Sequence, residues 1–219
     1  MSSDPPSFLV DEEIRALCND PSVRLIPQAE EDNFKNWSYD LRLGEEAYLS
    51  SDEHLKHLTN KDAIFIKPGE FALLLTKEEV RIPRNLVAFI SLKSSHAFKG
   101  LVNISGFQVD PGYSGKLALS VYNAGPNTVV LRENDSLYMI IFARLSKLAE
   151  ERKKEGPKYP GIYHLSADMI AAVKGPPVSL IKLNERVGRL EQLLYVLGGV
   201  VIAVVATIIA AFALGIVHT

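Results

Sequence analysis

The sequence contains almost no cysteine, because Cys18 is the single one among 219 residues. An internal disulfide and a zinc cluster built on several cysteines are therefore excluded. Zinc-dependent deamination is excluded with them, since such sites place a Cys pair and a further His or Cys on the metal. The five histidines form no replacement motif: His54 and His57 have ligand-like spacing, but their polar surroundings are typical of a loop. We expect no zinc and no metal site built by the protein alone.

The chain also lacks an excess of charge of either sign. It has 24 Lys and Arg residues against 26 Asp and Glu residues, which gives a formal net charge of −2. No strong positive field attracts a polyanion, so we expect no nucleic-acid partner. The first 18 residues have no basic start and no sustained apolar stretch. We therefore expect no N-terminal signal peptide.

Charge is missing altogether from residues 193–217, a run of 25 residues near the C-terminus. A helix rises about 1.5 Å per residue, so this run exceeds the roughly 30 Å hydrocarbon core of a bilayer. It predicts a single-pass C-terminal transmembrane helix. Basic residues precede it at Lys174, Lys182, Arg186 and Arg189. Their position predicts a membrane-bound protein whose large N-terminal part is cytoplasmic.

Between the termini the sequence is rich in short β-type segments. Residues 1–24 form an N-terminal segment with a short helix from about Asp11, and residues 25–147 then predict an all-β head with strands separated by Gly, Pro, Asn and Asp. In "KLALSVYN", alternate residues belong to opposite faces: Leu117, Leu119 and Val121 share one face, and Ala118, Ser120 and Tyr122 share the other. Many short strands with Gly and Pro turns favour a sandwich, jelly roll or distorted barrel.

A charged, proline-rich arm is expected over residues 148–178, and a coiled-coil-like helix over residues 179–192. Apolar residues there recur at alternating gaps of three and four, which is a heptad seam. The seam residues are Leu180, Leu183, Val187, Leu190, Leu194 and Leu197. Arg186 at a g position and Glu191 at the next e position fit pairing in a parallel coil. An amphipathic helix lying on the head is the alternative interpretation.

Six segments in one order connect this chain with a known family. They are "LIPQ", "SYDLRLGEE", "IKPGEFALLLTKEEVRIPRNLVAFI", "LKSSHAFKGL", "QVDPGYSGKLALSVYNAG" and "VVLRENDSLYMIIFARL". Over about residues 8–163 the sequence resembles the dCTP deaminase/dUTPase superfamily, and more closely its dCTP deaminase branch. The resemblance implies a mainly β, dUTPase-like distorted jelly-roll or β-barrel head. It also implies a homotrimer that binds a pyrimidine deoxynucleotide at sites shared between subunits.

The resemblance assigns roles to particular residues. Lys93, Ser94 and Ser95 match the segment that holds the triphosphate, and a cation with two hydroxyls suits anionic oxygens. Asp110 matches the aspartate that contacts the sugar and, in dUTPases, orients or deprotonates the attacking water, so it is the candidate catalytic residue. Mg²⁺ would be carried by the nucleotide phosphates rather than by a protein site.

Further nucleotide contacts are implied on the strand after Asp110 and in the arm. Ala118 and Leu119 match positions that read the pyrimidine through backbone groups, with Ser120 beside them. Lys158 resembles a lysine of a C-terminal arm that folds over the phosphates.

The sequence departs from the deaminase pattern at its catalytic charges. The deaminase arginine falls on Phe98 and the glutamate on Ser120. A positioned carboxylate supplies general acid–base help worth about 10²–10⁴-fold, which a serine hydroxyl alone does not provide. In the fourth block, Met139 replaces the usual glutamine and Asn134 the usual glycine.

Three functions stay open on these residues. The combination of a binding pocket, a heptad helix and a span favours a membrane-anchored nucleotide sensor or effector, since ligand binding can shift a conformational equilibrium. A dUTPase-type nucleoside triphosphate pyrophosphohydrolase using Asp110 is the first alternative. A dCTP deaminase with displaced catalytic groups is the second.

Overall fold

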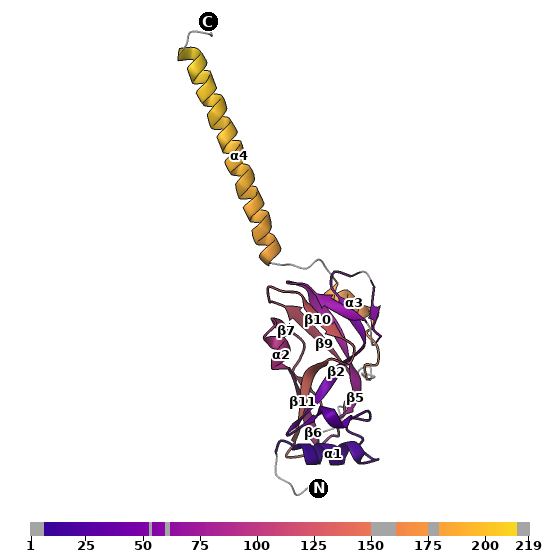
Figure 1. Cartoon of the computed structure of the whole chain (residues 1–219). Coiled ribbons are helices and arrows are strands. Elements are labelled where there is room, and N and C mark those ends of the chain that lie inside the picture. The colour runs from indigo at the N-terminus through magenta and orange to yellow at the C-terminus, as the bar shows by residue number, and fades with distance from the viewer. Residues whose placement is uncertain (1–6, 53, 60–61, 150–160, 175–179, 214–219) are drawn as a thin grey trace. The chain divides into compact units, whose positions relative to one another are not determined.

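The structure is a computed structural model that describes residues 7–52, 54–59, 62–149, 161–174 and 180–213. The chain divides into two compact units, Met1–Pro177 and Val178–Thr219. The first unit contains the β-rich head (Figure 1). The second unit contains one long helix.

The first unit contains most of the regular elements. Its helices are α1 (Asp11–Asn19), the 3₁₀ turn η1 (Glu31–Asn33), α2 (Ser94–Ala97) and α3 (Ala167–Val173). Its strands are β1 (Phe34–Lys35), β2 (Ser38–Leu49), β3 (Lys56–His57), β4 (Ala63–Ile66), β5 (Phe71–Arg81), β6 (Leu86–Leu92), β7 (Leu101–Asn103), β8 (Gln108–Val109), β9 (Ser114–Asn123), β10 (Val129–Arg132) and β11 (Ser136–Arg144). In the described part of the chain the main sheet has the order β7-β9-β5-β2-β11-β6-β8, and β4 pairs with β10 separately.

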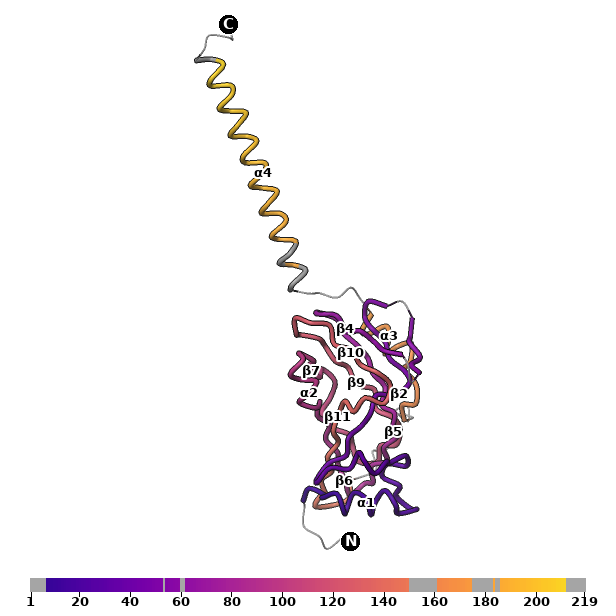
Figure 2. The backbone as a smooth tube through the Cα atoms, viewed as in Figure 1, coloured from indigo at the N-terminus to yellow at the C-terminus, as the bar shows by residue number. Residues whose placement is uncertain are grey.

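The long strand β2 joins the two halves of this antiparallel sheet. Its first half pairs with β11 from Tyr39 to Arg42, and its second half pairs with β5 from Leu43 to Leu49. The register shifts within both pairings and again between β5 and β9. Such bulges bend strands and increase their twist, so the sheet curls on itself (Figure 2). The predicted mainly β head is confirmed.

The alternation predicted for "KLALSVYN" is confirmed in β9. Leu117, Leu119 and Val121 are buried in the main core, whereas Ala118 and Ser120 on the other face are half-buried. The neighbouring strand β5 differs, because its segment from Ala72 to Thr76 is buried on both faces. On the outer face, Leu73 and Leu75 pack with Tyr48 and Leu165 in a second apolar cluster. Residues 161–173, which belong to the predicted arm (148–178), therefore cover the outside of the sheet.

The second unit contains the helix α4 (Leu180–Ala213). Over residues 180–213 it continues without a break from the predicted heptad helix (179–192) into the predicted span (193–217). Within it, Arg186–Ala211 is long and apolar enough to cross a membrane, with a mean hydropathy of 2.7 and no burial inside the protein. The described seam residues, from Leu183 to Leu197, are exposed, so nothing in this unit covers them.

Candidate nucleotide site

Five of the predicted site residues line two pockets of the chain. The first, which we name the Asp110 pocket, has a volume of about 270 Å³ and includes Asp110, Ala118 and Leu119. The second, the Lys93 pocket, has a volume of about 570 Å³ and includes Lys93 and Ser94. None of the described residues lines both pockets. The phosphate-holding and base-holding groups that the resemblance implies are thus separated within one subunit.

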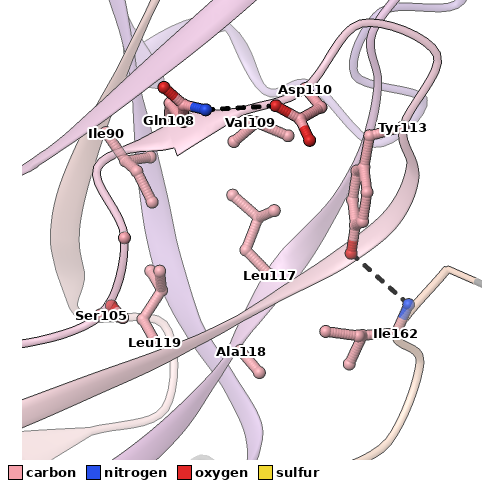
Figure 3. Close-up of a pocket in the computed structure, with 11 residues that line it drawn as sticks. Ile90, Ser105, Gln108, Val109, Asp110, Tyr113, Leu117, Ala118, Leu119 and Ile162 are labelled. Atoms are coloured by element: carbon pink, nitrogen blue, oxygen red, sulfur yellow. Dashed lines mark hydrogen bonds between the residues drawn. The ribbon is translucent and has the colours of Figure 1, made fainter. Parts of the chain in front are cut away.

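A tight turn after β8 presents Asp110 at its pocket. The amide of Tyr113 donates to the Asp110 carbonyl (3.2 Å), and Gly112 occupies the left-handed region with φ +83°. Glycine adopts that conformation without steric cost, which explains Pro-Gly after the aspartate. The side chain of Asp110 is exposed, and its Oδ1 accepts a hydrogen bond from Gln108 Nε2 (3.3 Å), as Figure 3 shows. The carboxylate is therefore both accessible and oriented.

The walls of the Asp110 pocket are mostly apolar. Ile90, Leu117 and Leu119 come from two strands, and Ile162 comes from the described part of the predicted arm (Figure 3). Tyr113 also lines the pocket, and its hydroxyl donates to the Lys116 carbonyl and accepts from the Ile162 amide (3.4 Å). Burial raises the pKa of Tyr113, so it stays neutral near pH 7. The pocket suits a flat ring and a sugar hydroxyl better than a polyphosphate, because no Lys or Arg is among its described lining residues.

Ser120 does not line the Asp110 pocket. It lies on β9 opposite Leu73, and its carbonyl accepts from the Ile104 amide (3.0 Å). Phe98, which occupies the position of the deaminase arginine, is 89% exposed. Neither position brings an ionisable group to this pocket.

The Lys93 pocket combines cations with an aromatic side chain. Lys93 and Ser94 line it from the start of α2, and Lys35 and Trp37 line it from the β1–β2 hairpin. Trp37 is half-exposed, and it is the single tryptophan of the chain. A pocket of this size falls within the range of small-molecule sites, roughly 300–1,000 Å³. Ser95, predicted to hold phosphate, is exposed but does not line the pocket.

The ammonium group of Lys93 already has partners inside the protein. It bonds to Asp40 Oδ2 (2.5 Å) and to Ser136 Oγ (3.1 Å). The Asp40 side chain is 6% exposed, whereas that of Lys93 is 30% exposed. The ion pair therefore fixes the direction of the ammonium group and offsets its charge. A phosphate ligand would have to share this cation with Asp40.

Two substitutions in the fourth block are explained by local structure. Asn134 has φ +70°, a left-handed conformation that glycine prefers and asparagine tolerates best among other residues. Its side-chain oxygen accepts a hydrogen bond from Lys77 Nζ (2.6 Å). Met139 lines the Lys93 pocket. The turn is thus preserved, while the pocket gains an apolar wall.

Sequence reasoning missed several lining residues. Trp37 and Asp40 lie in or beside the segment "SYDLRLGEE", which carried the resemblance. Nothing in that segment predicts that both line the same pocket as Lys93. Ile162 lies within the predicted arm and reaches its pocket only by tertiary packing. The predicted arm lysine, Lys158, lies outside the described residues. Among the residues described, no group of three or more His, Cys, Asp or Glu side chains is arranged to hold a metal ion.

Comparison with known proteins gives a consistent family. The family model described as dCTP deaminase-like matches residues 8–145. A dCTP deaminase from Pyrococcus abyssi is 33% identical over 126 residues, covering 58% of this chain and 80% of its own. One from Thermococcus kodakarensis is 34% identical over 144 residues, covering 65% of this chain and 88% of its own.

A solved structure agrees at the level of the fold. The crystal structure of 2'-deoxycytidine 5'-triphosphate deaminase from Agrobacterium tumefaciens superposes with a TM-score of 0.56 at 20% identity. The match covers 64% of this chain and half of that one. Taken with the matched family model and the two archaeal relatives, it leads to one conclusion: this chain belongs to the dCTP deaminase-like family.

Proposed function

We propose that the protein is a membrane-anchored, homotrimeric binder of a pyrimidine deoxynucleotide, acting as a sensor or effector rather than as a deaminase. The observation that carries this proposal is the division of the predicted site into two pockets. The Lys93 pocket has cations but no Asp110, and the Asp110 pocket has no cation among its described lining residues. Each is one half of a nucleotide site.

In a cyclic oligomer each interface joins two different surfaces of neighbouring subunits. The Lys93 pocket of one subunit can therefore lie next to the Asp110 pocket of another. The Lys93 pocket of one subunit would hold the phosphates, and the Asp110 pocket of its neighbour would hold the pyrimidine and the sugar. The relatives are named dCTP deaminases, which supports a pyrimidine deoxynucleotide as the ligand class. Ser95, Ser120 and Lys158 keep their proposed nucleotide contacts only if a neighbour or the arm brings the ligand to them.

Binding without deamination is favoured by the chemistry of the lining residues. The Asp110 pocket offers a single carboxylate, and Tyr113 beside it stays neutral. Phe98 and Ser120 supply neither charge that the deaminase pattern requires. Mg²⁺ bound to the phosphates would neutralise part of their charge; the protein's own residues would orient the phosphates and the sugar.

One observation favours pyrophosphate cleavage as a second candidate. Asp110 is exposed and is held in place by Gln108, so its carboxylate is able to orient a water molecule. In that case the protein would be a dUTPase-type pyrophosphohydrolase, with Lys93 and Ser94 holding the leaving phosphates.

The test uses the full-length protein in detergent with dCTP or dUTP and Mg²⁺. Trp37 fluorescence reports on the Lys93 pocket, and chromatography resolves the products. We expect saturable fluorescence change without turnover, and weaker binding after Lys93→Ala. Lys99→Ala is the matched control, because Lys99 is exposed and lines neither pocket.

Other outcomes assign other functions. Pyrophosphate release that disappears in Asp110→Asn identifies the hydrolase, and ammonia released from dCTP identifies a deaminase with displaced catalytic groups. Absence of nucleotide binding, or a monomer in sedimentation analysis, refutes the shared site.

A further inference from the structure

A buried carboxylate holds residues 164 and 165, which belong to the predicted arm (148–178). Glu46 lies in β2 and is 3% exposed. Its Oε1 bonds to His164 Nδ1 (2.7 Å), and its Oε2 accepts from the Leu165 amide (2.7 Å). Burying a carboxylate is costly unless it is hydrogen-bonded, and the two bonds to residues 164–165 offset that cost. We name residues 161–173 the return segment.

The return segment crosses β9 at a point with no spare room. A Cβ atom on Gly161 would lie 1.7 Å from the Ser114 carbonyl oxygen, and Gly115 beneath it has φ +150°. The Lys116 amide donates to the Ile162 carbonyl (2.7 Å) at the same crossing. Two glycines therefore let the backbones touch, and the path of the segment is narrowly defined.

Beyond His164, the return segment packs on the outer face of the sheet. Leu165 is buried and contacts a cluster with Tyr48, Leu73 and Leu75, and Met169 and Ile170 of α3 pack against it. Apolar burial stabilises the C-terminal part of the return segment, whereas the bonds to Glu46 hold residues 164–165 in place.

The near end of the same segment forms part of the Asp110 pocket. Ile162 lines that pocket, and its amide donates to the Tyr113 hydroxyl (3.4 Å; Figure 3). Only Tyr163 separates Ile162 from His164, which is bonded to Glu46. A change at Glu46 therefore reaches the pocket through two residues of backbone.

We infer that Glu46 is a positioning residue for the ligand of the Asp110 pocket: by holding residues 164–165, it keeps Ile162 in the pocket wall. Glu46 is absent from the residues that line the pocket. The inference rests on the proposed function, which places the pyrimidine and the sugar in this pocket. It adds a determinant of affinity at the end of the segment "SYDLRLGEE", to which the resemblance gave no ligand contact.

The test compares Glu46→Gln, Ile162→Ala and the double variant in the full-length protein with dCTP and dUTP. Glutamine has one acceptor oxygen and no charge, so it cannot accept from both His164 and the Leu165 amide. Because the pocket wall at Ile162 is then held less firmly, we expect roughly tenfold weaker affinity. If Glu46 acts through Ile162, the double variant is no weaker than the weaker single variant.

The matched control is Glu70→Gln. Glu70 is also fully buried and accepts from a backbone amide, that of Lys67 (2.7 Å), and from the Ser51 hydroxyl. It has no bond to the return segment among the described contacts. We expect this variant to lose stability while keeping its nucleotide affinity. His164→Ala changes an exposed side chain and removes its bond to Glu46. It tests the same role if Glu46→Gln does not fold.

A second readout is independent of nucleotide. Hydrogen exchange at the Lys116 and Leu165 amides should accelerate in Glu46→Gln and not in Glu70→Gln. Unchanged exchange, unchanged affinity or additive effects of Glu46→Gln and Ile162→Ala would each overturn the inference. Wild-type protein that binds no nucleotide would instead refute the proposed function, and the exchange experiment would still decide whether Glu46 positions Ile162.

Discussion

At the scale of single residues, the chain buries several polar groups beside its candidate site. Asp40 is almost fully buried and is matched by Lys93, whereas His96 is buried with only one of its two ring nitrogens bonded. His96 Nε2 donates to the Ser136 carbonyl (3.2 Å), so Nδ1 of the neutral ring is an acceptor without a partner among the described residues. The stability of the α2 region should therefore depend on whether the His96 ring is protonated.

His96 predicts a loss of stability on mild acidification. Burial lowers the pKa of His96; the nearby Lys99 and Lys93 act in the same direction, and Asp135 and the Ser136 carbonyl oppose them. The folded-state pKa of His96 is below the unfolded value of about 6.5. The neutral ring therefore favours the folded state above that pH, and this stabilisation is lost as the pH falls through the folded-state pKa. One proton changes the free energy of unfolding by at most about 1.4 kcal/mol per pH unit.

Urea unfolding at pH 7.5, 6.5 and 5.5, followed by Trp37 fluorescence, measures this effect. His96→Gln keeps a donor for the Ser136 carbonyl but does not titrate, so its stability should fall less over the same range. Equal pH dependence in both proteins would assign the effect to other groups.

At the scale of elements, the alternation of β9 was readable from the sequence because side chains alternate between the two faces of a strand. The continuous apolar run of β5 was not readable in the same way. Such a run marks burial on both faces, but nothing local identifies residues 161–173 as the cover.

The two faces of β9 should respond differently to truncation. Leu119 is 3% exposed in the main core, and Leu119→Ala should lower the free energy of unfolding by about 2–5 kcal/mol through lost burial and a residual cavity. Ser120 is half-buried on the opposite face, and Ser120→Ala should change it by no more than about 0.5 kcal/mol. Urea denaturation of both variants checks the difference, and similar losses would contradict the assignment of faces.

At the scale of the whole molecule, a β-rich unit and an apolar helix share one chain. In α4 the stretch Arg186–Ala211 has 26 residues and would be about 39 Å long as a helix, more than the roughly 30 Å hydrocarbon core. Its side chains are exposed, which distinguishes it from the core helix of a soluble domain. The proposal of a membrane anchor rests on this length and exposure.

The anchor predicts that the full-length protein resists extraction from membranes by alkaline carbonate. A variant with Val201→Asp and Val205→Asp should move toward the soluble fraction, because each charge near the centre of a span costs about 2.5–3.5 kcal/mol. Immunoblotting of the two fractions measures the distribution. Recovery of the wild-type protein in the supernatant would refute the span.

By itself the sequence determined the mainly β fold, the family, the short N-terminal helix and the apolar helix, since each depends on local periodicity or on motifs close in sequence. It also placed Asp110 before a Pro-Gly turn, whereas the left-handed conformation of Asn134 was seen only in the structure. Only the tertiary structure decided that Lys93 and Asp110 line different pockets, that Asp40 neutralises Lys93, and that Glu46 fastens the wall that contains Ile162. The physical reason is that these contacts join residues 53 to 119 positions apart, and side-chain bonds across such separations follow from packing rather than from local pattern.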